Sequence, residues 1–217
     1  IVEMGASAVG DIARLVSIVT PDVAVVLKVG LAHAGGFGSI EETQKAKAEL
    51  VTELPESAVA VLNVDDTRVG AMAGMTKARI VSFGFSDSAM VRAVQVSTSI
   101  EGTRFTVVAG EERIDAQLRI LGDHNVMNAL ATVAATREFG VKPTEAIAAL
   151  SELARAERWR MEVLRGPDGI TVINDGYNAS PDSMSAALKT LAEITRGVHR
   201  SIAVLGEMAE LGEFSDE

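Results

Sequence analysis

Short apolar runs alternate with segments of helical periodicity along the first part of the chain. Three runs are rich in β-branched residues and nearly continuous in apolar character, as buried parallel strands are. They cover residues 23–29, 58–62 and 79–83. Helical spacing covers residues 6–19 and 39–54. This order of strands and helices predicts an α/β fold with a doubly wound, mostly parallel sheet.

The pattern changes twice in the rest of the chain. Three more regularly alternating segments, joined by glycine-containing turns, predict an antiparallel appendage at residues 91–97, 103–109 and 113–118. Helices are expected at residues 124–139 and 144–154. After a change of composition at 156–160 come two strands (161–164 and 170–173), a helix (181–195) and a strand (202–205). We therefore expect two domains, residues 1–160 and a truncated, Rossmann-like α/β domain at 161–217.

The helix expected at residues 39–54 carries a lysine on its apolar side. Ser39 followed three residues later by Glu42 is the pattern of a capping box at a helix start. On a 3.6-residue period, Lys47 shares a stripe with four apolar residues. These are Ile40, Leu50, Val51 and Leu54. Lys45 points to the opposite side and is the solvated lysine.

Two interpretations of Lys47 are open from the pattern alone. In the first, its aliphatic stem lies along the apolar stripe and its ammonium group reaches water at the edge. In the second, burial lowers the pKa of the side chain, and the neutral amine becomes a nucleophile.

Composition limits the chemistry available to the chain. Its 217 residues, 47% of them hydrophobic and 23% charged, are ordinary for one large or two small globular domains. Because cysteine is absent, a metal would need oxygen and imidazole ligands, which favours magnesium over zinc. A net charge of −10 without a basic cluster argues against nucleic-acid binding. No apolar run approaches a membrane helix and no secretion signal is visible, so we expect a cytoplasmic protein without membrane insertion.

Candidate metal-binding residues follow the predicted strands, where open parallel sheets bind ligands. Glu3 is expected to end a first strand formed by residues 1–4. His33 follows the strand at 23–29 in a glycine-containing loop that leads into the helix of Lys47. An exposed carboxylate and a hydrogen-bonding loop histidine are the alternative interpretations of these two residues.

Candidate nucleotide contacts lie further along the chain. Asn125 and Asn128 share a helix face near its start, where side-chain amides could read the edge of a base. Helix capping would explain one of these asparagines but not both. Asp175 and Asn178 are expected at a strand end before a helix, and Arg160 at the domain junction. A capped turn and a surface arginine are the alternatives there.

Together, these pieces resemble the ATP-dependent Mur ligases of peptidoglycan synthesis. The resemblance covers nearly the whole chain and is carried by motifs in a specific order. They are VEMGA (2–6), VG (29–30) with AH (32–33), FGS (37–39), AKAE (46–49), LNVDD (62–66), GDHN (122–125) with NA (128–129), YNA (177–179) with PDSM (181–184), and VLGEMAELGE (204–213). The chain is most similar to the members that add D-alanyl-D-alanine, in the form found in actinobacteria.

The resemblance implies roles for the candidate metal-binding residues. Glu3 and His33 match metal-site positions. Lys47 matches a lysine that commonly carries a carbamate, whose carboxylate helps to hold a second magnesium ion. The resemblance therefore makes Lys47 and His33 the candidate catalytic residues, and it implies Mg²⁺ as a cofactor.

It also implies roles for the candidate nucleotide contacts. Asn125 and Asn128 match positions that contact adenine. Arg160 matches an arginine that reaches the nucleotide phosphates across the domain junction. Asp175 and Asn178 match positions near the nucleotide and the incoming amino-acid substrate.

The implied reaction uses ATP to phosphorylate the peptide carboxylate of UDP-MurNAc-tripeptide. The amine of D-Ala-D-Ala then attacks the acyl phosphate, and the amide, ADP and phosphate are released by a monomeric enzyme. One alternative is a folylpolyglutamate synthetase-like ligase, whose Asp-Gly-Ala-His-Asn-Pro motif parallels residues 175–178, although Tyr177 argues against it. The other is a nucleotide-binding module without catalytic activity.

The chain departs from the family pattern at several positions. Lys28 stands where asparagine is usual, Gly36 where glutamate is common, Asn174 where aspartate is frequent, and Ser180 where asparagine is frequent. The phosphate-binding motif G-x-x-x-x-G-K-[ST] does not occur in the 217 residues. In the family it lies upstream of the strand that ends at Glu3. We therefore expect this stretch of chain to be a fragment that binds ATP weakly and does not catalyse by itself.

Overall fold

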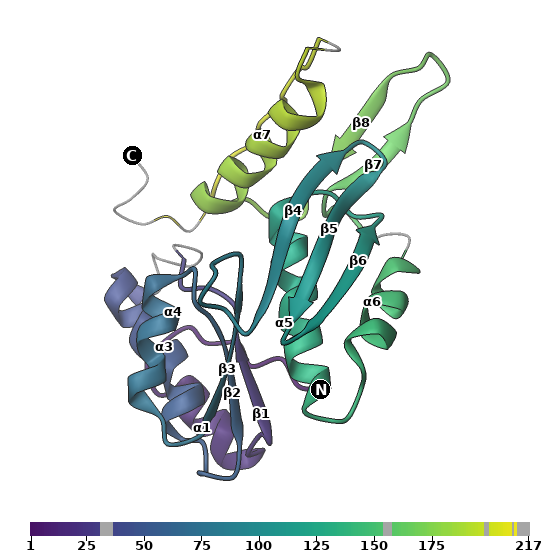
Figure 1. Ribbon diagram of the computed structural model, residues 1–217. Coiled ribbons are helices and arrows are strands. Elements are labelled where there is room, and N and C mark those ends of the chain that lie inside the picture. The colour runs from purple at the N-terminus through teal and green to yellow at the C-terminus, as the bar shows by residue number, and fades with distance from the viewer. Residues whose placement is uncertain (31–36, 154–157, 198–199, 210, 212–217) are drawn as a thin grey trace.

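The computed structural model describes residues 1–30, 37–153, 158–197, 200–209 and 211 (Figure 1). Six strands form one sheet in sequential order. They are β1 (Val23–Val26), β2 (Val59–Asn63), β3 (Arg79–Gly84), β4 (Val91–Ser99), β5 (Gly102–Ala109) and β6 (Glu112–Leu118). Strands β1 to β4 are parallel, whereas β5 pairs antiparallel with both β4 and β6. The expected mostly parallel sheet with an antiparallel appendage is confirmed.

Helices cover both faces of the parallel strands (Figure 1). On one face, Val61 and Phe83 pack with α5 (Asp123–Arg137) and α6 (Pro143–Ser151) in the larger core. On the other face, Leu62 packs with α3 (Ile40–Thr52) and α4 (Thr67–Ala71), and the 3₁₀ helix η1 (Met72–Met75) closes that core. All five residues of β2 are buried, which explains the continuous apolar run there.

Helix α1 (Asp11–Ile18) begins five residues later than the pattern predicts. The Oδ2 atom of Asp11 accepts hydrogen bonds from the backbone N–H groups of Ser7 and Ala8, both at 2.9 Å. These bonds hold residues 7–8 in a turn before the helix, and they lower the pKa of Asp11. The expected first strand ending at Glu3 is also wrong, since residues 1–6 have no regular structure and pair with no strand.

The carboxy-terminal region begins with an antiparallel pair, β7 (Glu162–Arg165) and β8 (Thr171–Asn174), and continues into α7 (Pro181–Thr195). Helix α7 packs against β4 and the start of α5. The strand expected at 202–205 is wrong. Val204 is 92% exposed there, and these residues lack the neighbouring strand whose backbone groups a strand needs. None of the helices that the structure describes is long and apolar enough to cross a membrane.

Candidate functional site

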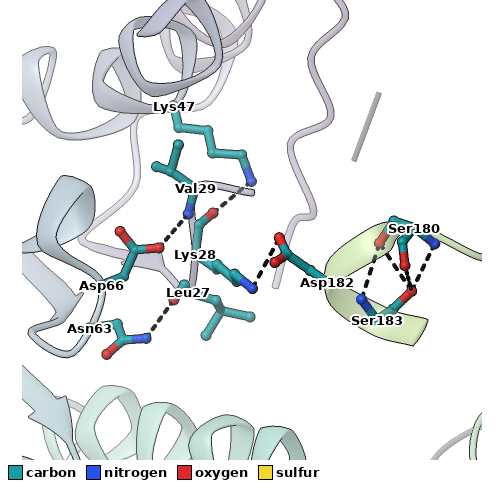
Figure 2. Close-up of polar contacts among 9 residues, drawn as sticks. All are labelled: Leu27, Lys28, Val29, Lys47, Asn63, Asp66, Ser180, Asp182 and Ser183. Atoms are coloured by element: carbon teal, nitrogen blue, oxygen red, sulfur yellow. Dashed lines mark hydrogen bonds and ion pairs between the residues drawn. The ribbon is translucent and has the colours of Figure 1, made fainter. Parts of the chain in front are cut away.

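Residues 27–29, which follow β1, are held by side chains rather than by strand pairing (Figure 2). The buried Asn63, at the end of β2, donates from Nδ2 to the carbonyl oxygen of Leu27 at 2.9 Å. The Oδ2 atom of Asp66 accepts from the backbone N–H of Val29, also at 2.9 Å. The predicted strand therefore ends early, at Val26, but the backbone beyond it keeps fixed partners.

Lys47 lies on the inner side of α3, as the periodicity predicts. It is half-buried between Ala46 and Ala48, which are both buried, whereas Lys45 is exposed. The Nζ atom of Lys47 donates to the carbonyl oxygen of Lys28 at 2.9 Å (Figure 2).

The surroundings of Lys47 have two opposing effects on the pKa of its amine. Burial lowers the pKa of its amine, and the carboxylate of Asp66 offsets part of that effect. The amine is directed at the backbone after β1, and its role as a nucleophile stays a prediction.

Asp66 joins the two segments that border this site. Its Oδ1 atom accepts from the backbone N–H groups of Arg68 and Val69, at 3.0 and 3.1 Å, and so caps α4. Its Oδ2 atom holds Val29. Sequence reasoning assigned no role to Asp66 or to Asn63. A signal was present, because Asn63 ends the buried parallel strand β2 and Asp66 comes three residues after it, at the carboxyl edge of the sheet.

Lys28 links the segment after β1 to the carboxy-terminal region. Its Nζ atom lies 3.1 Å from Oδ2 of Asp182, in the first turn of α7 (Figure 2). Asp182 approaches the backbone closely, since a Cβ atom on Gly30 would lie 2.8 Å from its Oδ2 atom. Ser180 and Ser183 cap α7 reciprocally, which leaves the Asp182 carboxylate available for the ion pair. A lysine that departs from the family pattern therefore makes a contact between the two expected domains.

We expect this ion pair to stabilise the protein only slightly. A double-mutant cycle with Lys28→Gln and Asp182→Asn should give a coupling energy of at most about 1 kcal/mol in urea unfolding, because both side chains are about half exposed. The pair Lys77–Glu56, more exposed and 3.5 Å apart, is the matched control and should give a coupling near zero. A coupling above about 2 kcal/mol would contradict this expectation.

The two asparagines at the start of α5 share one face, as predicted. Nδ2 of Asn128 donates to Oδ1 of Asn125 at 3.4 Å. Nδ2 of Asn125 also donates to the carbonyl oxygen of Leu121 at 2.9 Å and lies 3.0 Å from Nε2 of His124. Asn125 thus bonds the backbone before the helix while its Oδ1 atom faces Asn128.

At the expected domain junction, the segment before β7 that carries Arg160 lies beside the segment after β8 that carries Asp175. The guanidinium carbon of Arg160 lies 4.3 Å from the centroid of the Tyr177 ring. Oδ1 of Asp175 accepts from the backbone N–H of Met161 at 3.0 Å. Asn178 is exposed, and its Oδ1 atom accepts from the next backbone N–H at 2.8 Å. The contacts of Arg160 and Asn178 also satisfy the plainer interpretations, a surface arginine and a capped turn, so the substrate roles stay predictions.

The metal site expected from the sequence is only partly covered by the structure. His33 and Gly36 lie outside the described residues, and Glu3 is exposed on an irregular segment. Within the described ranges, no group of three or more His, Asp or Glu side chains is placed to hold a metal ion. An ammonium group repels cations, so Lys47 would fit a magnesium site only after conversion to an anion.

Comparison with known proteins gives consistent matches over nearly the whole chain. The family model of the Mur ligase middle domain matches residues 1–136, and that of the Mur ligase, glutamate ligase domain matches residues 159–217. The UDP-N-acetylmuramoyl-tripeptide–D-alanyl-D-alanine ligase of Mycobacterium bovis is 45% identical over an alignment of 217 positions, which covers 98% of this chain and 42% of that protein.

Two solved structures are similar in fold and sequence. MurF from Acinetobacter baumannii has a TM-score of 0.87 at 29% identity, over 97% of this chain and 45% of that one. MurF from Thermotoga maritima in complex with ADP also has a TM-score of 0.87 at 29% identity, over 98% of this chain and 48% of that one. The chain therefore spans less than half the length of these relatives.

Proposed function

Since this chain belongs to the Mur ligase family, we propose that the intact protein is an ATP-dependent ligase that adds D-alanyl-D-alanine to UDP-MurNAc-tripeptide in peptidoglycan synthesis. The observation that carries this proposal is the 45% identity to a relative of that name across 98% of the chain. In the proposed reaction, ATP phosphorylates the peptide carboxylate, and the dipeptide amine attacks the acyl phosphate. The amide forms, and ADP and phosphate leave.

The nucleotide base is proposed to bind at the start of α5. Two observations support this site: the amides of Asn125 and Asn128 share one helix face, and a structural relative was solved with ADP. Arg160, Asp175 and Asn178 are proposed to contact the phosphates and the incoming substrate across a domain boundary near residue 160.

Lys47 is proposed to carry a carbamate in the active enzyme. Its neutral amine attacks carbon dioxide, a nitrogen–carbon bond forms, and one proton passes to solvent. The lowered pKa of Lys47 supports this step. So does the geometry: a carbamate retains one N–H, which could keep the bond to the Lys28 carbonyl.

The remaining features of the proposal follow from the carbamate and from the composition. The carbamate carboxylate would join Glu3 and His33 as oxygen and imidazole ligands for Mg²⁺. When bound, the ion would offset the negative charge of the transferring phosphoryl group. We further propose a cytoplasmic monomer that does not bind nucleic acid.

The test is substrate-dependent release of ADP by the full-length protein. With ATP and Mg²⁺, we expect release only when UDP-MurNAc-tripeptide and D-Ala-D-Ala are both present. Release that requires a folate and glutamate instead would favour the folylpolyglutamate synthetase-like alternative. Tight ATP binding without release under either condition would favour the non-catalytic module.

A further inference from the structure

The ring of His124 occupies space that a glycine leaves open at the start of α5. Gly122 has a φ of +96°, and a Cβ atom on it would lie 2.7 Å from Cε1 and 2.9 Å from Nδ1 of His124. The same point is 3.2 Å from Oγ1 of Thr190, a buried residue of α7. Any other residue at position 122 would therefore displace the imidazole. The ring lies between the first turn of its own helix, α5, and helix α7.

A hydrogen bond determines how the His124 ring and the Asn125 side chain are oriented relative to each other. Nε2 of His124 lies 3.0 Å from Nδ2 of Asn125. An amide nitrogen can only donate, so this hydrogen bond requires Nε2 to accept, which means a neutral ring with its proton on Nδ1. The second hydrogen of the amide goes to the carbonyl oxygen of Leu121 at 2.9 Å. If the Asn125 amide were flipped, its Oδ1 atom would face the carbonyl oxygen of Leu121 and Nε2 of His124. Both of these atoms are acceptors, so the flipped orientation would lose both hydrogen bonds.

The orientation of Asn125 decides which atom remains for a ligand. With both amide hydrogens used, Oδ1 is its remaining polar atom, and it receives one long hydrogen bond from Asn128 at 3.4 Å. An amide oxygen can accept two hydrogen bonds, so Oδ1 retains capacity for a donor. Adenine carries an amino donor at position 6, where guanine carries a carbonyl acceptor.

We propose that neutral His124 is a positioning residue that determines base specificity, because its hydrogen bond holds Oδ1 of Asn125 toward the base and so favours adenine over guanine. The inference rests on the proposed nucleotide site at Asn125 and Asn128. His124 itself does not touch the base. It acts through the amide of Asn125.

Protonation of His124 would break this arrangement, because Nε2 would become a donor facing the donor of Asn125. Burial of the ring lowers the pKa of His124 below the ordinary value of 6.5, and the carboxylates of Asp175 and Asp123 act in the opposite direction. Asp123 also lies 3.5 Å from Nζ of Lys189 on α7. The neutral ring therefore predominates at pH 7.5, and base selectivity should fall only as the pH drops below about 6.5.

The experiment measures the dissociation constants of ADP and GDP for the full-length protein, by competition with a fluorescent ADP analogue at pH 7.5 and 5.5. The ratio of the two constants cancels changes in phosphate ionisation, which both ligands share. His124→Phe should reduce the preference for ADP about tenfold at pH 7.5, the effect of one hydrogen bond that orients a base-reading group. As the pH is lowered stepwise below 6.5, the wild-type preference should fall, and a preference that stays constant until the protein unfolds would contradict the inference.

Two further variants separate positioning from packing. The side-chain carbonyl of glutamine can accept the same hydrogen bond and does not titrate, so His124→Gln should retain most of the preference and show no change between the two pH values. Lys189→Met disturbs the contact between α5 and α7 without reaching the amide. Its preference for ADP should equal that of the wild type.

Contrary outcomes distinguish this inference from the proposed nucleotide site. If Asn125→Ala weakens ADP binding but His124→Phe leaves the ratio unchanged, the site stands and the role of His124 is wrong. If Asn125→Ala binds ADP normally, the site itself is wrong. If His124→Phe fails to fold, His124→Gln provides the test. A ratio of ADP to GDP dissociation constants that still changes with pH in His124→Gln would overturn the inference.

Discussion

Lys47→Ala is expected to remove nearly all ligase activity from the intact protein, by at least about 100-fold. The change removes the proposed carbamate, and with it an anionic ligand on a long arm beside the segment after β1. It also removes the hydrogen bond to the carbonyl oxygen of Lys28. Initial rates of ADP release measure the effect. Formate or acetate should restore part of the activity, because a small carboxylate can occupy the vacated position without repairing the backbone contact.

The control for this prediction is Lys45→Ala, two positions away on the same helix. Lys45 is exposed, and its Nζ atom lies 3.9 Å from Glu42, so its removal should leave activity close to that of the wild type. A second readout is independent of turnover: ¹³C-labelled bicarbonate should produce a carbamate resonance in the wild type and none in Lys47→Ala. Full activity in Lys47→Ala would show that the carbamate and the assigned role of this helix are wrong.

Asp66→Ala should lower the free energy of unfolding by about 2–3 kcal/mol, measured by urea titration. The variant loses the cap of α4, which alone typically costs about 1 kcal/mol. It also leaves the backbone N–H of Val29 without its partner in a partly buried position. Because residues 27–29 carry the carbonyl group that Lys47 contacts, activity should fall as well.

Asp66→Asn separates the two functions of this carboxylate. Its amide oxygen can still cap α4, but its amide nitrogen cannot accept from Val29. We therefore expect this variant to lose about half as much stability as Asp66→Ala. A loss below about 0.5 kcal/mol in Asp66→Ala would show that water replaces the carboxylate at both positions, and that the segment after β1 is held mainly by Asn63.

Local patterns were sufficient for most of the fold. The apolar runs at residues 58–62 and 79–83 became β2 and β3 with boundaries shifted by at most one residue. All of β2 and the last four residues of β3 are buried, and a strand that is buried on both faces has a continuous apolar sequence. The inner position of Lys47 was also predictable, since helix periodicity alone places it on the buried side. Ser39 caps α3 as the pattern predicts, with its side chain accepting from the N–H of Glu42.

Elements that depend on a distant partner were not predictable in the same way. The runs at residues 1–4 and 202–205 are apolar enough for strands, but neither pairs with a strand in the described structure. Apolar character is a property of the segment, whereas strand formation also needs the backbone groups of a neighbour. The short helices α4 and η1 were missed because neither is long enough to show a helical period.

The sequence by itself determined the family, the order of the main elements and the candidate side chains, because each of these depends only on residue types and their spacing along the chain. Only the tertiary structure decided how those side chains are used. The ion pair of Lys28 with Asp182 joins residues from opposite ends of the chain. The bond of Asp66 to Val29 depends on how two parallel strands end side by side. The amide of Asn125 is oriented by a neighbouring imidazole whose space Gly122 provides. Distances and hydrogen-bond directions between such groups arise only when the chain folds, and no local pattern records them.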